Sequence, residues 1–170
     1  MSDFIIKLVL VLLPMYVANS SAMLFGGKYP LDFGKKFFDK RPIFGPGKTF
    51  RGAIVGITLG TLCAFIVSIL FPQLLVNLTK DYVLFGFLVS VGAIVGDIVA
   101  SFFKRRNNIA PGEPVLFLDQ LDFVIGALLF GSILYVPDFV EAIIIAVVTI
   151  VVHKAANLIA FKVKLKKVPW

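Results

Sequence analysis

Long apolar segments separated by basic connections dominate the pattern of this 170-residue sequence. A helix needs roughly 20 residues to cross the ~30 Å hydrocarbon layer of a membrane. Five segments of about this length carry few charges, at residues 4–25, 52–71, 82–103, 121–136 and 139–161. The pattern therefore predicts an all-α integral membrane protein with five transmembrane helices.

Composition supports this prediction. Hydrophobic residues make up 59% of the chain and the mean hydropathy is +0.96, far above the values of soluble domains. No internal repeat and no flexible linker divides the sequence, so we expect one membrane domain over residues 1–170. Its two long connections are a loop at 26–51, rich in Gly, Pro and Phe, and a second loop at 104–118.

The basic residues give the orientation. Seven lie between the first two segments, three between the third and fourth, and four after the fifth, whereas the remaining connections are nearly uncharged. The positive-inside rule places the N-terminus outside, the C-terminus and both loops in the cytoplasm, and the protein in the cell membrane. Contact with anionic lipid headgroups explains most of the net charge of +7, so no nucleic-acid partner is expected. A homodimer is possible, and the sequence does not decide the oligomeric state.

A carboxylate inside the third segment is the first candidate site residue. Asp97 follows an apolar run and lies about two turns before Lys104. Ionisable side chains within a membrane span are costly and usually face a cavity, a partner or an ion. Ser101 and Lys104 share its helix face. A salt bridge with a basic residue of a neighbouring helix is the alternative interpretation of Asp97.

Two further carboxylates begin the fourth segment. Asp119 and Asp122 are three residues apart, so on a helix they point the same way. Asp119 alone is also compatible with an N-cap role. Three carboxylates without Cys or a second His disfavour zinc, and the combination with many cations favours Mg²⁺ bound together with substrate phosphates. The sequence thus predicts a Mg²⁺-dependent phosphate site at the cytoplasmic face.

The first loop supplies a second group of candidate residues. It runs from Arg41 through Gly45-Pro-Gly-Lys-Thr to Gly52, directly before the second segment. Pro42 stands where a P-loop needs its first Gly, and no buried strand precedes the loop, so a P-loop is excluded. Gly and Pro nevertheless allow close backbone approach, and we expect Lys48, Thr49 and Arg51 to hold phosphates at the helix start.

Small and polar residues within the segments are less decisive. Gly52, Gly56 and Gly60 line one helix face and predict close helix packing. Gly92 and Gly96 repeat this spacing, and they either pack against another helix or leave room for a ligand beside Asp97. Polar residues also lie within the first and fifth segments, among them Asn19, His153 and Asn157, and contacts between helices are the simpler explanation for them. Without a second His or Cys, His153 is a poor candidate for a metal ligand.

These motifs resemble those of a known enzyme group. Gly96-Asp97, Ser101, Lys104-Arg105 and Asp119-Gln-Leu-Asp122 resemble the signature of membrane cytidylyltransferases that make CDP-diacylglycerol, and Gly45 to Gly52 resembles their second motif. The compact form, with five spans, Asn19 and a tail from Asn157 to Trp170, resembles the CDP-archaeol synthase family over nearly the whole chain.

The resemblance implies Mg²⁺-dependent transfer of CMP from CTP to an unsaturated archaeal ether lipid phosphate, with release of pyrophosphate. Asp97, Asp119, Asp122 and Lys104 are then expected to be catalytic, the three carboxylates as metal ligands. The residues expected to contact substrate are Lys48, Thr49, Arg51, Ser101, Arg105, Arg41, Asn19 and Asn157. A CDP-diacylglycerol synthase acting on phosphatidic acid, a small cation-coupled transporter and an assembly subunit are the alternatives; the last leaves the clustered carboxylates unexplained.

Overall fold

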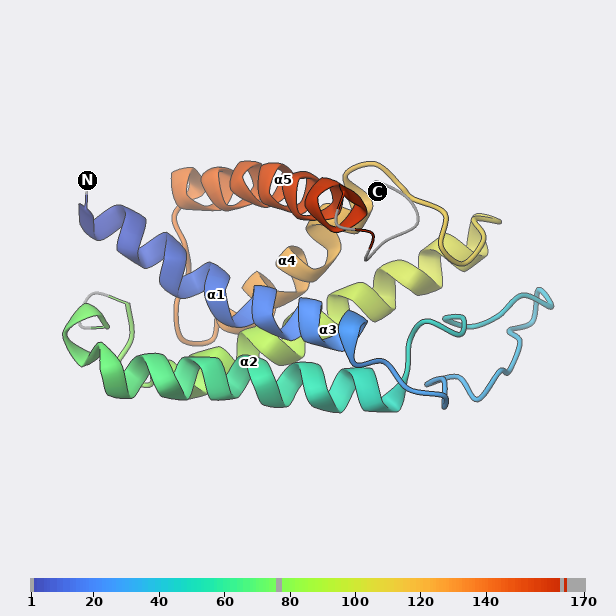
Figure 1. The fold of residues 1–170 in the computed structure, drawn as a ribbon, viewed down its shortest axis with the longest axis horizontal. Helices are drawn as coiled ribbons and strands as arrows, with labels where there is room; N and C mark the ends of the chain where they lie inside the picture. Colours follow the sequence, from blue (N-terminus) through green and yellow to red (C-terminus); the bar gives the residue numbers. More distant parts are fainter. Residues whose placement is uncertain (1, 76–77, 163, 165–170) are drawn as a thin grey trace.

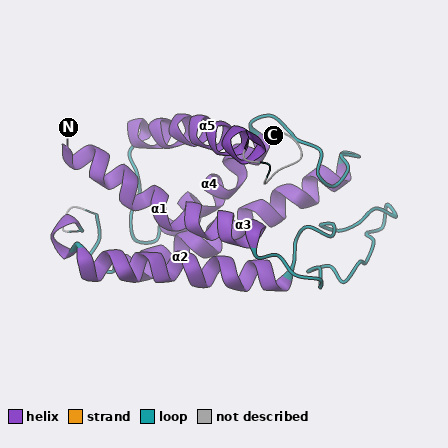
Figure 2. Ribbon diagram, viewed as in Figure 1, coloured by secondary structure: helices purple, strands orange, loops and turns teal. Residues whose placement is uncertain are grey.

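The computed structural model describes residues 2–75, 78–162 and 164, and all regular structure among them is helical, with no β-strand (Figure 2). The helices are α1 (Ser2–Leu24), α2 (Phe50–Leu70), α3 (Tyr82–Arg106), α4 (Leu118–Gly131) and α5 (Phe139–Lys162), with a 3₁₀ turn, η1 (Pro72–Leu74), after α2. The all-α prediction is confirmed for these residues.

The first four helices form the packed body of the protein. α3 packs most extensively on α4 and α1 on α2, whereas α5 makes few contacts with the other helices. Figure 1 shows α5 on the opposite side of the molecule from α2, with α1, α3 and α4 between them. The core between the helices contains Met15, Phe85, Val89, Phe123 and Ala127, all fully buried.

The outer surface is apolar, as expected of a membrane protein. Large apolar side chains such as Ile54, Ile69 and Leu129 are more than half exposed on this surface. Among the described residues, three helices are long and apolar enough to cross a membrane: Asp3–Leu24, Phe50–Leu70 and Tyr82–Arg106. These exposed apolar side chains and long apolar helices are suited to contact with lipid.

The predicted segments agree with the helices except at α4. The ends of α1, α2, α3 and α5 fall within three residues of the predicted ones, but α4 begins at Leu118 and ends at Gly131 instead of covering 121–136. The earlier start is stabilised by Gln120, whose side-chain oxygen accepts the Phe117 amide. At 14 residues, α4 extends about 21 Å, which is shorter than a full span.

Glycines set the distances between the paired helices. A Cβ on Gly56 would lie 2.7 Å from the Ala18 carbonyl oxygen of α1, and one on Gly60 would lie 2.8 Å from that of Pro14. The predicted packing role of this glycine row is confirmed. On α3, a Cβ on Gly92 would lie 2.3 Å from the Gly126 carbonyl oxygen of α4. The second glycine row therefore serves helix packing and leaves no room for a ligand.

Candidate active site

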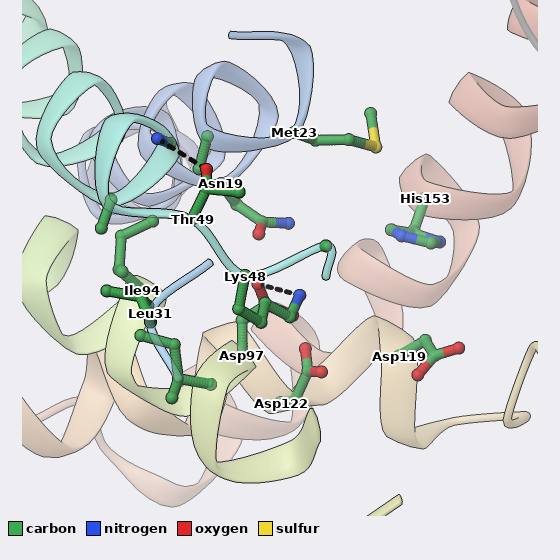
Figure 3. Close-up of a pocket in the computed structure, with 15 residues that line it drawn as sticks. Asn19, Met23, Leu31, Lys48, Thr49, Ile94, Asp97, Asp119, Asp122 and His153 are labelled. Atoms are coloured by element: carbon green, nitrogen blue, oxygen red, sulfur yellow. Dashed lines mark hydrogen bonds and ion pairs between the residues drawn. The ribbon is translucent and has the colours of Figure 1, made fainter. Parts of the chain in front are cut away.

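A cleft opens where α1 and α3 end and α2 and α4 begin, with α5 along its side (Figure 3). It consists of two adjoining cavities of about 340 and about 310 Å³. Both are lined by Lys48, Asp97, Asp119, Asp122 and His153, so they share one wall. The structure thus brings all three predicted carboxylates to a single cleft of the size that binds small ligands.

Asp97 is ion-paired across the cleft wall. The Lys48 ammonium donates to both of its carboxylate oxygens, at 2.6 Å each. About a quarter of each side chain is exposed, and the exposed parts face the cleft. The salt-bridge interpretation of Asp97 therefore holds in this structure, but its partner is a predicted phosphate ligand from the loop rather than a residue inside another helix.

Asp119 forms a second lysine–carboxylate pair. Its Oδ1 accepts from the Lys104 ammonium at 2.7 Å, and its Oδ2 accepts the Val115 amide at 2.9 Å. The residue lies in the first turn of α4, after the N-cap position at Phe117. Capping alone does not account for Asp119, because its carboxylate also joins the end of α3 to the segment before α4.

Asp122 makes no ion pair with any residue that the structure describes, and its carboxylate accepts its neighbour's amide, that of Phe123. Its position depends on the contact of α3 with α4, since a Cβ on Gly96 would lie 2.3 Å from the Asp122 carbonyl oxygen. The absence of a side chain at Gly96 therefore allows Asp97 and Asp122 to line the same cleft from two helices.

The two cavities differ in their remaining walls. The first is lined by Asn19 and by apolar side chains of α1, α2 and α3, including Ala22, Ile94 and Ile98. The second adds Lys104 and Arg105, together with the loop residues 111–114. The first cavity therefore has more aliphatic side chains in its remaining wall, and the second has two further cations.

Arg105 is placed to bind an anion in the second cavity. It is buried, and its Nη1 donates to the Ile109 carbonyl oxygen. Its Nε has no hydrogen-bond partner among the described residues. A buried donor without a partner is costly. A phosphate in this cavity would relieve that cost.

The hydroxyl groups predicted to contact phosphate lie beside the cleft. Thr49 caps α2, where its Oγ1 accepts the amides of Gly52 at 3.1 Å and Gly27 at 3.0 Å. Its hydroxyl proton remains available as a donor to the first cavity. Ser101 is buried and lines the second cavity. The structure brings both residues, with Asn19, to the candidate site.

Asp32, which sequence reasoning missed, anchors the glycine-rich loop. Its Oδ2 accepts the amides of Phe44 and Gly45 at 2.9 Å, and its Oδ1 accepts that of Gly34 at 2.9 Å. Burial alone would raise the pKa of this carboxyl, but these hydrogen bonds outweigh it and lower the pKa below its usual value. Gly45 adopts a φ of 98°, which favours glycine. The loop is therefore held in place three residues before Lys48.

A second anchor joins the loop to the end of α3. The Arg106 guanidinium lies 4.8 Å from the ring centre of Phe37 and 4.9 Å from that of Phe102, and its Nε is 3.3 Å from an Asp39 oxygen. Its Nη2 donates to the Pro42 carbonyl oxygen. We call Arg106 with Phe37, Phe102 and Asp39 the arginine clamp.

Three predicted substrate residues are not placed in the cleft by the described structure. Arg41 donates to the Arg106 carbonyl oxygen and so belongs beside the clamp. Arg51 lies on the outer side of α2, next to Phe25 and Ile54. Asn157 belongs to α5, but its side chain lies outside the described residues.

His153 is the main cleft residue that the sequence did not assign to the site. Figure 3 shows its ring pointing from α5 toward the cleft, opposite Lys48 and beside Asp119. Met23 and Glu113 are further lining residues that were missed. The signal for His153 was its place as the single His of the chain within an apolar segment.

The donor atoms suit a hard divalent cation. Three carboxylates line one cleft, and oxygen ligands are what Mg²⁺ prefers. Among the described residues, however, no group of three acidic, His or Cys side chains is close enough to form a ligand set in this arrangement. Two of the carboxylates are paired with lysines instead. The chemistry fits Mg²⁺, and binding it would require those pairs to rearrange.

Comparisons with known proteins identify the family of this chain. The family profile described as CarS-like, CDP-archaeol synthase, matches residues 1–170. A CDP-archaeol synthase of Methanocaldococcus jannaschii is 49% identical over 165 residues, covering 94% of this chain and 93% of the relative. One from Pyrococcus abyssi is 47% identical over 159 residues, covering 94% of each chain.

A solved structure is also similar. It is described as an intramembrane enzyme for archaeal membrane lipid biosynthesis, with a TM-score of 0.79 and 31% identity over 88% of this chain and 91% of that one. The chain therefore belongs to the CarS-like family of CDP-archaeol synthases.

Proposed function

We propose that this chain transfers CMP from CTP to the phosphate of an unsaturated archaeal ether lipid, using Mg²⁺ and releasing pyrophosphate. Family membership makes it a CTP-dependent cytidylyltransferase that acts in a membrane on a lipid phosphate. The observation that carries the rest of the proposal is the cleft itself. Three carboxylates and the cations Lys48, Lys104 and Arg105 line adjoining cavities, of which the first adds aliphatic side chains and the second adds Lys104 and Arg105.

The two cavities correspond to the two substrates. A lipid phosphate needs apolar surroundings for its chains, which the first cavity provides through α1, α2 and α3. A nucleoside triphosphate brings several negative charges, and the second cavity provides Lys104, Arg105 and loop amides. We assign CTP to the second cavity and the lipid phosphate to the first. The reacting groups then meet at the shared wall of Lys48, Asp97 and Asp122.

For this reaction, correct positioning of the two substrates and neutralisation of their phosphate charges matter more than proton transfer. A phosphate monoester has a second pKa of about 6, so the lipid phosphate is already anionic at neutral pH. One of its oxygens attacks the α-phosphorus of CTP, and the bond to the β-phosphate oxygen breaks, releasing pyrophosphate. Lys104 and Arg105 neutralise the departing pyrophosphate, and Lys48 neutralises charge at the reacting phosphorus.

The three cleft carboxylates are the proposed ligands of the metal ion. Asp97, Asp119 and Asp122 would hold Mg²⁺, which would neutralise part of the charge of the substrate phosphates. The incoming phosphates also offer Lys48 and Lys104 new anionic partners. Exchange of each lysine from its carboxylate to a phosphate would free the carboxylate for the cation.

The membrane placement follows from the same arrangement. We propose five membrane crossings in one domain, with the N-terminus outside and the cleft at the cytoplasmic face of the cell membrane. Both loops lie at one end of the helix bundle, where Arg106 of α3 contacts the loop before α2. CTP would reach the cleft from the cytoplasm and the lipid from the bilayer.

The test is incubation of the purified protein with labelled CTP, Mg²⁺ and either an ether-linked or an ester-linked lipid phosphate. We expect label transfer to the lipid and stoichiometric pyrophosphate release, with preference for the unsaturated ether lipid and loss of turnover on metal chelation. Asp122→Asn is expected to abolish transfer while the protein stays folded in detergent. Absence of pyrophosphate release with both lipids would refute the enzymatic proposal and favour a transporter.

A further inference from the structure

The single histidine of the chain faces the proposed reaction centre from a helix that supplies no other basic side chain to the cleft. His153 lines both cavities, and Figure 3 shows its ring directed across the cleft toward Lys48. It lies on α5, which contacts the other helices least. Its position in the shared wall places an imidazole beside both cavities.

The distribution of cations limits what His153 can do. In the second cavity, Lys104 and Arg105 are available for the phosphates of the nucleotide. Among the described residues, the basic side chains that line the first cavity are Lys48 and His153. Lys48 is bound to both oxygens of Asp97. In the first cavity, His153 is therefore a second nitrogen donor from a basic side chain, in addition to Lys48, the Asn19 amide and the Thr49 hydroxyl.

We propose that His153 is a substrate-binding residue that donates a hydrogen bond to the phosphate of the lipid substrate. The proposal rests on the proposed function, which assigns the lipid to the first cavity. An imidazole has an N–H donor in both its neutral and its protonated form. The hydrogen bond therefore does not require a particular protonation state, and α5 closes the side of the cleft by contact with the bound headgroup.

The role of a metal ligand fits the structure less well. Among the described residues, no group of His, Cys, Asp and Glu side chains that includes His153 is arranged to hold a cation. If His153 instead donates a hydrogen bond to the α-phosphate of CTP, its loss should also raise the KM for CTP. These alternatives are separated by the substrate whose KM changes.

The test compares His153→Ala, His153→Gln and Val152→Ala. Val152 is the preceding residue of α5 and is 43% exposed on the outer surface, so its variant is a control for changes in the helix. We expect His153→Ala to raise the KM for the lipid phosphate about 10- to 100-fold, as for loss of one hydrogen bond to a charged group. The KM for CTP should change less than about threefold, and the glutamine amide should restore part of the lipid affinity.

A binding measurement separates this inference from the proposed function. The lipid phosphate alone, without CTP, should raise the melting temperature of the wild-type protein and of Val152→Ala, and should raise that of His153→Ala much less. Equal stabilisation of all three proteins, or an equal rise of both KM values, would overturn the assignment of His153. Absent cytidylyl transfer in the wild-type protein, with the stabilisation pattern intact, would refute the proposed function and leave His153 as a lipid-phosphate ligand.

Discussion

Replacing Arg106 by Ala should detach the first loop from the end of α3. In the structure its guanidinium lies within 5 Å of two ring centres, forms an ion pair with Asp39 and donates to the Pro42 carbonyl oxygen. Two cation–π contacts contribute about 0.5–1 kcal/mol each, the partly exposed ion pair about 0.5 kcal/mol, and the hydrogen bond from a charged donor at least about 1.5 kcal/mol.

These contributions are not fully additive, because one guanidinium makes all of them. We therefore take about 3 kcal/mol as the amount by which Arg106 stabilises the attached loop relative to the detached loop. That value corresponds to a roughly 100-fold larger population of the detached loop. Hydrogen exchange reports this population directly. The amides of Phe37 and Ile43, which donate to the Arg41 and Lys35 carbonyl oxygens, should exchange roughly 100-fold faster in Arg106→Ala.

The α2 amides should keep their protection, because α2 packs on α1 through its own glycine row. Asn107→Ala is the matched control. Asn107 is the next residue, is exposed and bonds only within its own helix end, so its loss should leave the loop unchanged. Arg106→Lys keeps the charge but loses the planar group that stacks on both rings, and should fall between the two. Unchanged exchange over residues 35–43 in folded Arg106→Ala would show that the clamp does not hold the loop.

The remaining predictions concern Asp32 and the contact of α3 with α4. Asp32→Asn should cost about 1.5–3 kcal/mol of loop stability, because one carboxylate oxygen that accepts amides becomes an NH₂ group; hydrogen exchange at Phe44 and Gly45 measures it. The folded-state pKa of Asp32 is lowered, so its contribution is complete above the unfolded-state pKa of about 3.9 and is lost as the pH falls through the lower folded-state value. Loop protection that does not change on acidification in the wild-type protein would contradict this linkage. Gly96→Ala should lower the free energy of thermal unfolding by about 1–3 kcal/mol and should also lower the rate of CMP transfer, because its Cβ would displace the Asp122 backbone. Val99→Ala, at an exposed position of the same helix, serves as control. Full activity in Gly96→Ala would refute the argument.

The sequence predicted the elements that local patterns determine. Apolar length gave the boundaries of α1, α2, α3 and α5, and the four-residue glycine spacing gave the face of α2 that packs on α1. It also gave the three carboxylates of the cleft, because an acid within an apolar helix has few structural explanations. The shorter α4 was mispredicted because apolar residues continue beyond Gly131 into a turn that ends before Pro137.

The loop could not be predicted in the same way, because distant residues determine its conformation. Arg106 contacts the Pro42 carbonyl oxygen 64 residues away, and in the sequence it is one member of a basic run at a helix end. Such runs are typical of cytoplasmic helix ends, so Arg106 could not be distinguished from its neighbours. Asp32 did have a local signal, since its side chain accepts the amide two residues later, which is a common turn for Asp.

The ion pairs of the cleft connect the two halves of the predicted site more closely than the motifs alone suggest. The motif around Lys48 and the motif around Asp97 are 49 residues apart, yet one ammonium binds both oxygens of one carboxylate. Lys104 and Asp119 repeat the arrangement. With these pairs intact, Asp97 and Asp119 are each neutralised by a lysine, and only Asp122 of the three cleft carboxylates makes no ion pair among the described residues. Phosphates and Mg²⁺ are therefore expected to bind together, because phosphate draws the lysines away while the cation replaces them beside the carboxylates.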